Sequence, residues 1–221
     1  AGKSTLLLAL ACLIRPTAGS LLFRGQPLDS SAARFAYRRR ISMVFQEPLL
    51  FDTTVEGNIA SGLRLRRTAG EETRRIVAEC AERFGVSHLL GRAARKLSGG
   101  EARRTSLARA FALQPEILIL DEPFSALDPP TRDGLIEDLG RILGDTPVTA
   151  VMATHEPAEA LRLSDEIAVM NAGRIVQVGP PETVMNQPAD ELVASFVGVE
   201  SVIAGTVVAA DRGLLAVATH E

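Results

Sequence analysis

The sequence predicts an α/β protein with an open parallel sheet, a helical insertion and a small β region at its C-terminal end. Short apolar runs alternate with longer helix-like segments over most of the 221 residues, and this order favours a parallel sheet. The run at residues 117–120 is apolar throughout, as expected of a parallel strand covered on both faces. Residues 52–95 instead carry helix-like segments rich in Arg and Glu, with little strand character.

The individual elements follow from the apolar runs and the chain-breaking residues between them. Residues 6–14 predict a buried helix that Pro16 and Gly19 end, and the turn at Gly25 predicts a hairpin-like edge. Further strands are expected at residues 41–45, 117–120, 148–153 and 167–170. Further helices are expected at residues 55–66, 71–84, 100–113, 130–143 and 156–163.

The last fifty residues predict a second hairpin around Gly173, a helical tail that starts at Pro180, and paired strands from Val202 onward. We therefore expect one large domain at residues 1–198 and the start of a small β domain at residues 199–221, cut at its end.

The composition narrows the function classes. Net charge of −3, no Trp and a single Tyr argue against a nucleic-acid partner, which would favour a basic face or stacking aromatics. The two cysteines, Cys12 and Cys80, lack metal-site spacing and are expected to be reduced core residues. No apolar run reaches the roughly 18 residues that a membrane span needs, and no signal peptide is visible.

The first five residues, Ala1, Gly2, Lys3, Ser4 and Thr5, are typical of the end of a phosphate-binding loop that runs into a helix. Backbone N–H groups at a helix N-terminus bind anions, Lys3 would supply a charge for the β and γ phosphates, and the Ser4 hydroxyl suits Mg²⁺. The alternative is a helix start capped by Ser4 or Thr5. Only two of the 24 basic residues are lysine, and one of them is Lys3.

Two further motifs point to nucleotide chemistry. Asp121 and Glu122 follow the buried strand directly, at the edge where open α/β sheets bind ligands; Asp121 could hold Mg²⁺ and Glu122 could polarise an attacking water. The alternative is a pair of solvated acids at a strand end. The third motif consists of Ser98, Gly99, Gly100 and Glu101, at the start of the helix expected at residues 100–113. It predicts a second anion-binding turn, with a good helix cap as the alternative.

In this order the motifs resemble the ATPase subunits of ABC transporters, over nearly all of residues 1–180. The resemblance implies a P-loop NTPase (RecA-like) core with a helical subdomain at about residues 48–112. It also implies that the rest of the phosphate loop, the first strands and the aromatic residue that stacks on adenine lie upstream of residue 1, so that the chain is truncated at its N-terminus.

The resemblance assigns a role to each matched residue. It implies that Gln46 senses Mg²⁺ and couples the site to a membrane subunit, that Asp121 holds the metal and that Glu122 is the catalytic base. It implies that the loop ending at Asp128 crosses a dimer interface and that His155 contacts the γ-phosphate. Without it, His155 would be an ordinary histidine at a strand end.

The resemblance also implies a mechanism. The turn at residues 98–101 would close over the ATP of the opposite subunit, so that a head-to-tail homodimer, or a paired ATPase subunit, encloses two ATP molecules. ATP binding would close the pair and hydrolysis would open it. The implied partners are transmembrane permease subunits and, indirectly, a periplasmic or extracellular binding protein, with the ATPase on the cytoplasmic face of the membrane. Two residues depart from the common pattern, Glu101 in place of Gln and Glu156 in place of Asp.

An importer is expected, because no membrane span is fused to the ATPase and the segment from Gln46 to Ile59 resembles importer subunits. Residues 128–132 and the C-terminal tail look closest to tungstate or molybdate importers, with phosphate, sulfate or polyamine importers as alternatives. A soluble ABC ATPase would usually carry coiled coils or paired cassettes, and a P-loop kinase or GTPase would lack the motif at residues 98–101. Intact Asp121, Glu122 and His155 argue against a regulatory, non-catalytic subunit.

Overall fold

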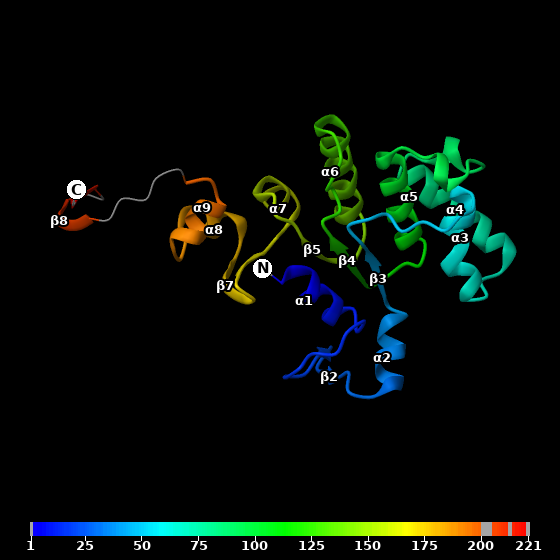
Figure 1. The fold of residues 1–221 in the computed structure, drawn as a ribbon, viewed down its shortest axis with the longest axis horizontal. Helices are drawn as coiled ribbons and strands as arrows, with labels where there is room; N and C mark the ends of the chain where they lie inside the picture. The colour runs from blue at the N-terminus through cyan, green and yellow to red at the C-terminus, as the bar shows by residue number, and fades with distance from the viewer. Residues whose placement is uncertain (1, 200–204, 212–213, 220–221) are drawn as a thin grey trace. The chain divides into compact units, whose positions relative to one another are not determined.

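The computed structural model describes residues 2–199, 205–211 and 214–219. The chain divides into two compact units, one formed by Gly2–Leu163 and the other beginning at Ser164 (Figure 1). Among the described residues, no helix is long and apolar enough to cross a membrane.

The first unit combines a parallel sheet with seven α-helices among its described residues. The helices are α1 Lys3–Leu10, α2 Ser31–Arg38, α3 Val55–Leu65, α4 Gly70–Arg83, α5 Gly99–Phe111, α6 Pro129–Gly144 and α7 Pro157–Leu163. The strands are β1 Leu22–Phe23, β2 Gln26–Pro27, β3 Ile41–Val44, β4 Ile117–Asp121 and β5 Thr149–Ala153. Two short 3₁₀ helices lie between α4 and α5, at Ser87–Leu89 and Ala94–Lys96.

The parallel sheet has the order β3-β4-β5, with β4 in the centre. Successive side chains of β4 enter different cores, as the alternation of a strand requires. Leu118 and Leu120 join the core that contains the helical segment and α6, whereas Ile119 joins the core formed with α1 and α2. Helices α1 and α6 accordingly lie on opposite faces of the sheet (Figure 1). The expected strand with both faces covered is confirmed.

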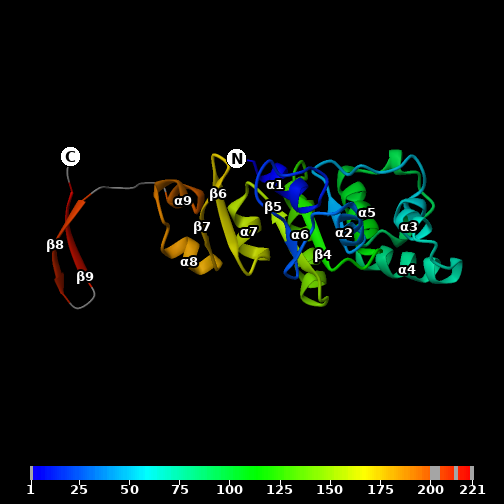
Figure 2. The ribbon, with the colours of Figure 1, turned by 90° about the horizontal axis from the view of Figure 1, so that it is seen from below.

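The helical segment α3–α5 shares one continuous core with the sheet. Its buried side chains pack with one another and with β3, β4 and α6: Val55, Ile59, Phe84, Leu89, Leu107 and Phe111. The rings of Phe84 and Phe111 lie 5.1 Å apart and stack at a tilt, a geometry that aromatic pairs favour. Figure 2 shows α3 and α4 on the far side of α5 from the sheet. The three helices predicted for this segment are present, each within two residues of its expected bounds.

One N-terminal prediction needs correction, and one helix was missed. Helix α1 ends at Leu10, not near Ile14, because Cys12 adopts a left-handed φ of 54° that a helix cannot continue through. The helix was expected to be buried, but Leu7 is the one residue of α1 that is buried. The sequence could not show this, because a run of leucines has no polar face to indicate which side meets the sheet. Helix α2 was not predicted, although Ser30 caps it by accepting a hydrogen bond from the Ala33 N–H at 3.0 Å.

The second unit contains two antiparallel strand pairs and two short helices among its described residues. These are β6 Ile167–Asn171 with β7 Arg174–Gly179, α8 Pro181–Asn186, α9 Glu191–Phe196, and β8 Gly205–Asp211 with β9 Leu214–Thr219. The hairpin predicted around Gly173 is confirmed, because β6 pairs antiparallel with β7. The strand at residues 167–170 was also expected in the parallel sheet, and this needs correction: among the described strands that sheet consists of β3, β4 and β5. The helical tail is two helices, because Gln187 precedes a proline and leaves the α region.

The two cysteines differ in burial. Both are free thiols. Cys80 is buried in the helical core, as predicted, and burial raises the pKa of its thiol to about 11. Cys12 is half-buried at the edge of the smaller core.

Candidate nucleotide-binding site

The start of α1 has the backbone that a phosphate-binding turn needs. Gly2 is the N-cap of α1 with a left-handed φ of 89°, a conformation that glycine adopts at little cost. No side chain caps this helix, so the alternative of a Ser4 or Thr5 cap does not hold, and Thr5 is exposed. Ala1 lies outside the described residues. The first N–H groups of α1 therefore have no side-chain acceptor and are suited to an anion.

Ser4 and Asp121 join this helix to the central strand. The Ser4 hydroxyl donates a hydrogen bond to Asp121 Oδ1 at 3.0 Å. Asp121 is the last residue of β4 and is buried. Two oxygen-bearing side chains thus meet at the carboxyl end of the parallel sheet, where they are suited to a hard cation such as Mg²⁺.

Glu122 lies next to this pair and makes two contacts through its carboxylate. Its Oε1 lies 4.0 Å from Lys3 Nζ, and its Oε2 lies 2.5 Å from His155 Nδ1. The side chain is 14% exposed, and the Glu122 N–H donates to the carbonyl of Ala153 at 2.9 Å. Its φ of 48° is left-handed, which is rare for a side chain of this size and common at functional sites.

We call Lys3, Ser4, Asp121, Glu122 and His155 the Glu122 cluster. The sequence predicted all five as site residues, and they come from α1, the end of β4 and the loop after β5. The cluster combines a cation for phosphates, two oxygen ligands for a metal, and a carboxylate that can accept a proton from water.

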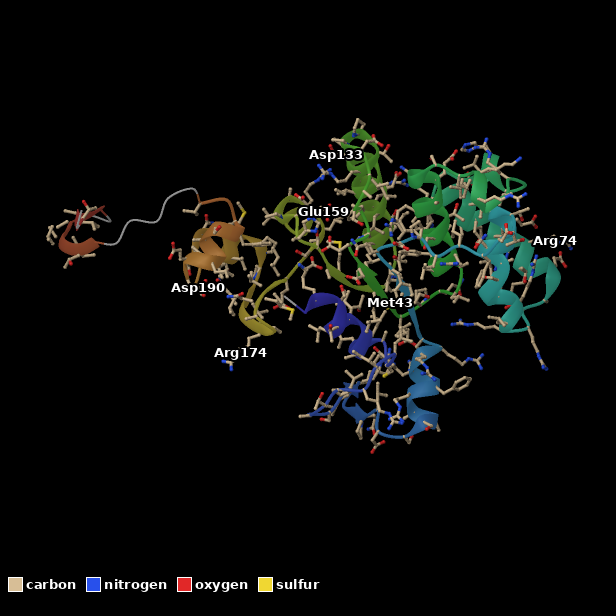
Figure 3. The ribbon with its side chains drawn as sticks, viewed as in Figure 1. Met43, Arg74, Asp133, Glu159, Arg174 and Asp190 are labelled. Atoms are coloured by element: carbon tan, nitrogen blue, oxygen red, sulfur yellow. The ribbon has the colours of Figure 1, made fainter. Side chains whose placement is uncertain are left out.

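A supporting network that the sequence did not reveal fixes the turn at His155. The Thr154 hydroxyl accepts a hydrogen bond from the Glu156 N–H at 3.0 Å and donates one to Glu159 Oε2 at 2.5 Å. Glu159 lies on α7 (Figure 3). It is 5% exposed, and burial raises the pKa of its carboxyl. Nothing in the local sequence distinguishes this buried glutamate from the many exposed ones.

The turn formed by Ser98, Gly99, Gly100 and Glu101, here called the signature turn, is a reciprocal cap of α5. The Glu101 N–H donates to Ser98 Oγ, and the Ser98 N–H donates to Glu101 Oε2 at 2.7 Å. The other carboxylate oxygen, Oε1, accepts from Arg92 at 3.1 Å. The hydrogen bond from the Ser98 N–H, with Arg92 nearby, lowers the pKa of Glu101.

The signature turn lies against α6 and not against the Glu122 cluster. A Cβ at Gly100 would meet Thr131 Cγ2 at 2.7 Å, and Thr131 in turn donates its N–H to Asp128, the N-cap of α6, at 3.2 Å. Within the part of the chain that the structure describes, no hydrogen bond or ion pair joins the signature turn to the Glu122 cluster. Two predicted groups of site residues are therefore separate.

Gln46 is placed in neither group. Its side chain is exposed, and its described contact is made by its backbone carbonyl, which accepts a hydrogen bond from Arg103. Its predicted role as a Mg²⁺ ligand stays a prediction.

Comparison with known proteins agrees with this geometry. The sequence model of the ABC transporter family matches residues 1–125. The chain belongs to the ABC transporter family. It carries the ATP-binding domain, and the curated relatives that it matches include import ATP-binding proteins.

Three relatives illustrate the range. The molybdate/tungstate import ATP-binding protein WtpC of Thermococcus kodakarensis is 41% identical over 93% of this chain and 62% of that protein. The sulfate/thiosulfate import ATP-binding protein CysA of Mycolicibacterium paratuberculosis is 41% identical over 94% of this chain and 57% of that protein. The spermidine/putrescine import ATP-binding protein PotA of Trichodesmium erythraeum is 39% identical over 93% of this chain and 54% of that protein. The chain thus spans little more than half the length of these relatives.

Among solved structures, CbiO1 from Clostridium perfringens, described as part of the ABC transporter complex CbiONQ, superposes with a TM-score of 0.78. It is 30% identical, and the match covers 85% of this chain and 76% of that one. The predicted α/β fold of an ABC ATPase is confirmed.

Proposed function

We propose that this domain binds ATP with Mg²⁺ and hydrolyses it, and that two copies use the hydrolysis to drive import through an ABC transporter. One observation carries the proposal. The carboxylate of Glu122 contacts both Lys3 and His155, directly beside the hydrogen-bonded Ser4 and Asp121.

The donor set fits Mg²⁺. Ser4 and Asp121 offer two oxygens 3.0 Å apart, and Mg²⁺ in nucleotide sites is held by one or two protein oxygens together with phosphates and water. The ion would neutralise charge on the phosphates; Ser4, Asp121 and Gln46 are the residues proposed to hold it.

The chain's own residues supply the remaining chemistry. Lys3, aided by the first N–H groups of α1, would bind and orient the phosphates. Glu122 would accept a proton from the attacking water at Oε1 or Oε2. His155 would hold Oε2 through its Nδ1–H and contact the γ-phosphate, in an orientation that Thr154 and Glu159 fix.

The separation of the signature turn from the Glu122 cluster supports action in pairs. If both bind the same nucleotide, they must come from different copies, which gives a head-to-tail homodimer with two shared sites. ATP would favour the closed pair because it contacts both copies, and loss of the γ-phosphate would release one set of contacts.

The family relationship supports a position at the cytoplasmic face of the membrane, bound to transmembrane permease subunits and served by an external binding protein. For the cargo we propose tungstate or molybdate, on the resemblance of residues 128–132 and the tail. The curated relatives divide among molybdate/tungstate, sulfate and polyamine importers at nearly equal identity, so sulfate is the first alternative.

Replacement of Glu122 by Gln tests the catalytic assignment. In the complete protein, Glu122→Gln should bind Mg-ATP, form a stable dimer and hydrolyse ATP at least about 100-fold more slowly, the usual contribution of a general base. The matched control is Glu156→Gln, which removes a carboxylate 3.7 Å from the same histidine and should stay active. Normal turnover by Glu122→Gln would refute the assignment.

The cargo and the transport role need separate measurements. Copurification with a membrane permease would distinguish the importer from a soluble ABC ATPase. Calorimetric titration of the proposed external binding protein with tungstate, molybdate, sulfate, phosphate and spermidine would identify the cargo. Preference for any of the last three would contradict the tungstate or molybdate proposal.

A further inference from the structure

The segment that follows β3, residues 45–51, is held to its surroundings mainly by side chains. It carries Gln46, and we call it the Gln46 segment. Arg103 of α5 donates hydrogen bonds to the carbonyl of Phe45 at 2.7 Å and to the carbonyl of Gln46. A single guanidinium therefore holds two successive carbonyls, which its fork of N–H donors suits well.

Arg103 is a buried cation with unusual surroundings. It is 3% exposed, and its Nε is buried with no hydrogen-bond partner. Among the described residues its hydrogen bonds go to backbone carbonyls and none of the ion pairs includes it. Burial lowers the pKa of its guanidinium. A buried charge without a counter-ion is costly, and a residue chosen for packing alone would be apolar.

A second arginine of α5 holds the same segment further along. Arg109 donates to the carbonyl of Leu49 at 2.7 Å, and its guanidinium lies 5.5 Å from the centre of the Phe51 ring. The two arginines are six residues apart on the helix, about 9 Å along its axis. The Gln46 segment is thus bound to α5 at two levels.

The N-terminus of α5 is the signature turn. Because Arg103 and Arg109 bind the Gln46 segment to α5, a displacement of the segment would move α5. The serine and glycines of the signature turn would move with the helix. We propose that Arg103 is a positioning residue that makes the Gln46 segment and the signature turn move together, so that nucleotide bound at the Glu122 cluster orients the turn toward the partner copy. This inference rests on the proposed ATP-driven pairing and assigns the residue that transmits it.

The test compares two arginines of the same helix in the Glu122→Gln background of the complete protein. Arg103→Met removes both hydrogen bonds to the Gln46 segment and keeps the volume. Arg104→Met is the matched control, because Arg104 contacts Asp138 at 2.6 Å and does not contact that segment. Arg103→Lys keeps the charge on a single nitrogen, which can donate to one of the two carbonyls but does not reproduce the fork of the guanidinium. If Arg103→Met does not fold, Arg103→Lys replaces it in the comparison with Arg104→Met.

Mg-ATP affinity of the monomer, measured with a fluorescent analogue, should be unchanged in all variants. ATP-driven dimerisation should weaken about tenfold or more in Arg103→Met, as expected from loss of charged hydrogen bonds. It should stay near the parent value in Arg104→Met and recover in part in Arg103→Lys. Equal dimerisation of Arg103→Met and Arg104→Met would overturn the inference.

Hydrogen exchange of the monomer decides the matter without dimerisation. Mg-ATP should change amide exchange at residues 46–50 and at residues 98–102 in the parent, and only at residues 46–50 in Arg103→Met. If the parent shows no response at residues 98–102, or if Arg103→Met retains it, the inference is wrong. If the parent responds at both segments but never dimerises, the proposed function fails while the coupling stands.

Discussion

The two adjacent glycines of the signature turn should respond differently to the same substitution. A Cβ at Gly99 would meet no atom within 4 Å, whereas a Cβ at Gly100 would lie 2.7 Å from Thr131 Cγ2. Real Cβ contacts are essentially never that short. Cγ2 is bonded to the β-carbon of Thr131, close to the backbone of the first turn of α6, where the Thr131 N–H donates to Asp128. Gly100→Ala must therefore displace α5 from the first turn of α6.

The magnitudes follow from two opposing effects. Alanine in place of glycine in a helix stabilises by up to about 1 kcal/mol, and overpacking costs about 1–3 kcal/mol. Gly99→Ala gains the first without the second, so its free energy of unfolding should equal or exceed that of the parent. Both variants share the first effect, so Gly100→Ala should be less stable than Gly99→Ala by the overpacking cost alone, about 1–3 kcal/mol.

Urea unfolding of the nucleotide-free protein, followed by circular dichroism, measures both values. Thr131→Ser removes Cγ2 and keeps the hydroxyl, so it should restore most of the stability of Gly100→Ala in the double variant. Equal stability of Gly99→Ala and Gly100→Ala, or no rescue by Thr131→Ser, would refute this account of the contact between α5 and α6.

Three further results are expected. Thr154→Val removes the hydroxyl that holds the turn at His155 and leaves the buried carboxylate of Glu159 without its donor. In a steady-state ATPase assay kcat should fall about tenfold, and the free energy of unfolding should fall by about 1–3 kcal/mol, whereas Thr154→Ser should keep both values. Because the pKa of Glu101 is lowered in the folded state, its stabilising effect is present above its ordinary pKa of 4.5 and is lost as the pH falls through the lowered value; the stability difference between the parent and Glu101→Gln should shrink accordingly in urea titrations at decreasing pH. Iodoacetamide at pH 8 should label Cys12 before Cys80 in the folded protein, because the Cys80 thiol is buried with a pKa of about 11, and mass spectrometry that finds Cys80 labelled first would contradict the described core.

The sequence predicted well where local pattern and tertiary environment agree. Every residue of the strand at 117–120 is apolar because both faces of the strand are covered. The residue types alone therefore predicted that this strand is buried. Each residue of the Glu122 cluster lies in the first turn of a helix, at the end of a strand or just after one. Their proximity in space follows from the parallel sheet, whose carboxyl ends lie at one edge.

The sequence failed where long-range contacts decide. Arg103 precedes the buried Leu107 by four residues and the buried Ala110 by seven. This spacing predicts that it lies on the same face of the helix, toward the core. An arginine is nonetheless assumed to be exposed unless its acceptors are known. Those acceptors, the carbonyls of Phe45 and Gln46, lie more than fifty residues away in sequence. Glu159 was missed for another reason: its partner Thr154 is only five residues away in sequence, but the burial of the Glu159 side chain depends on packing that the sequence does not show.

The central claim is that one nucleotide is bound by the Glu122 cluster of one copy and the signature turn of another. Mixing two inactive variants of the complete protein, Lys3→Ala and Ser98→Arg, tests it directly. In a mixed head-to-tail pair one site carries both substitutions and the other carries neither, so an equal mixture should recover about a quarter of the parent ATPase rate, although each variant alone is inactive. A mixture that forms mixed pairs yet remains as inactive as its components would contradict the shared site.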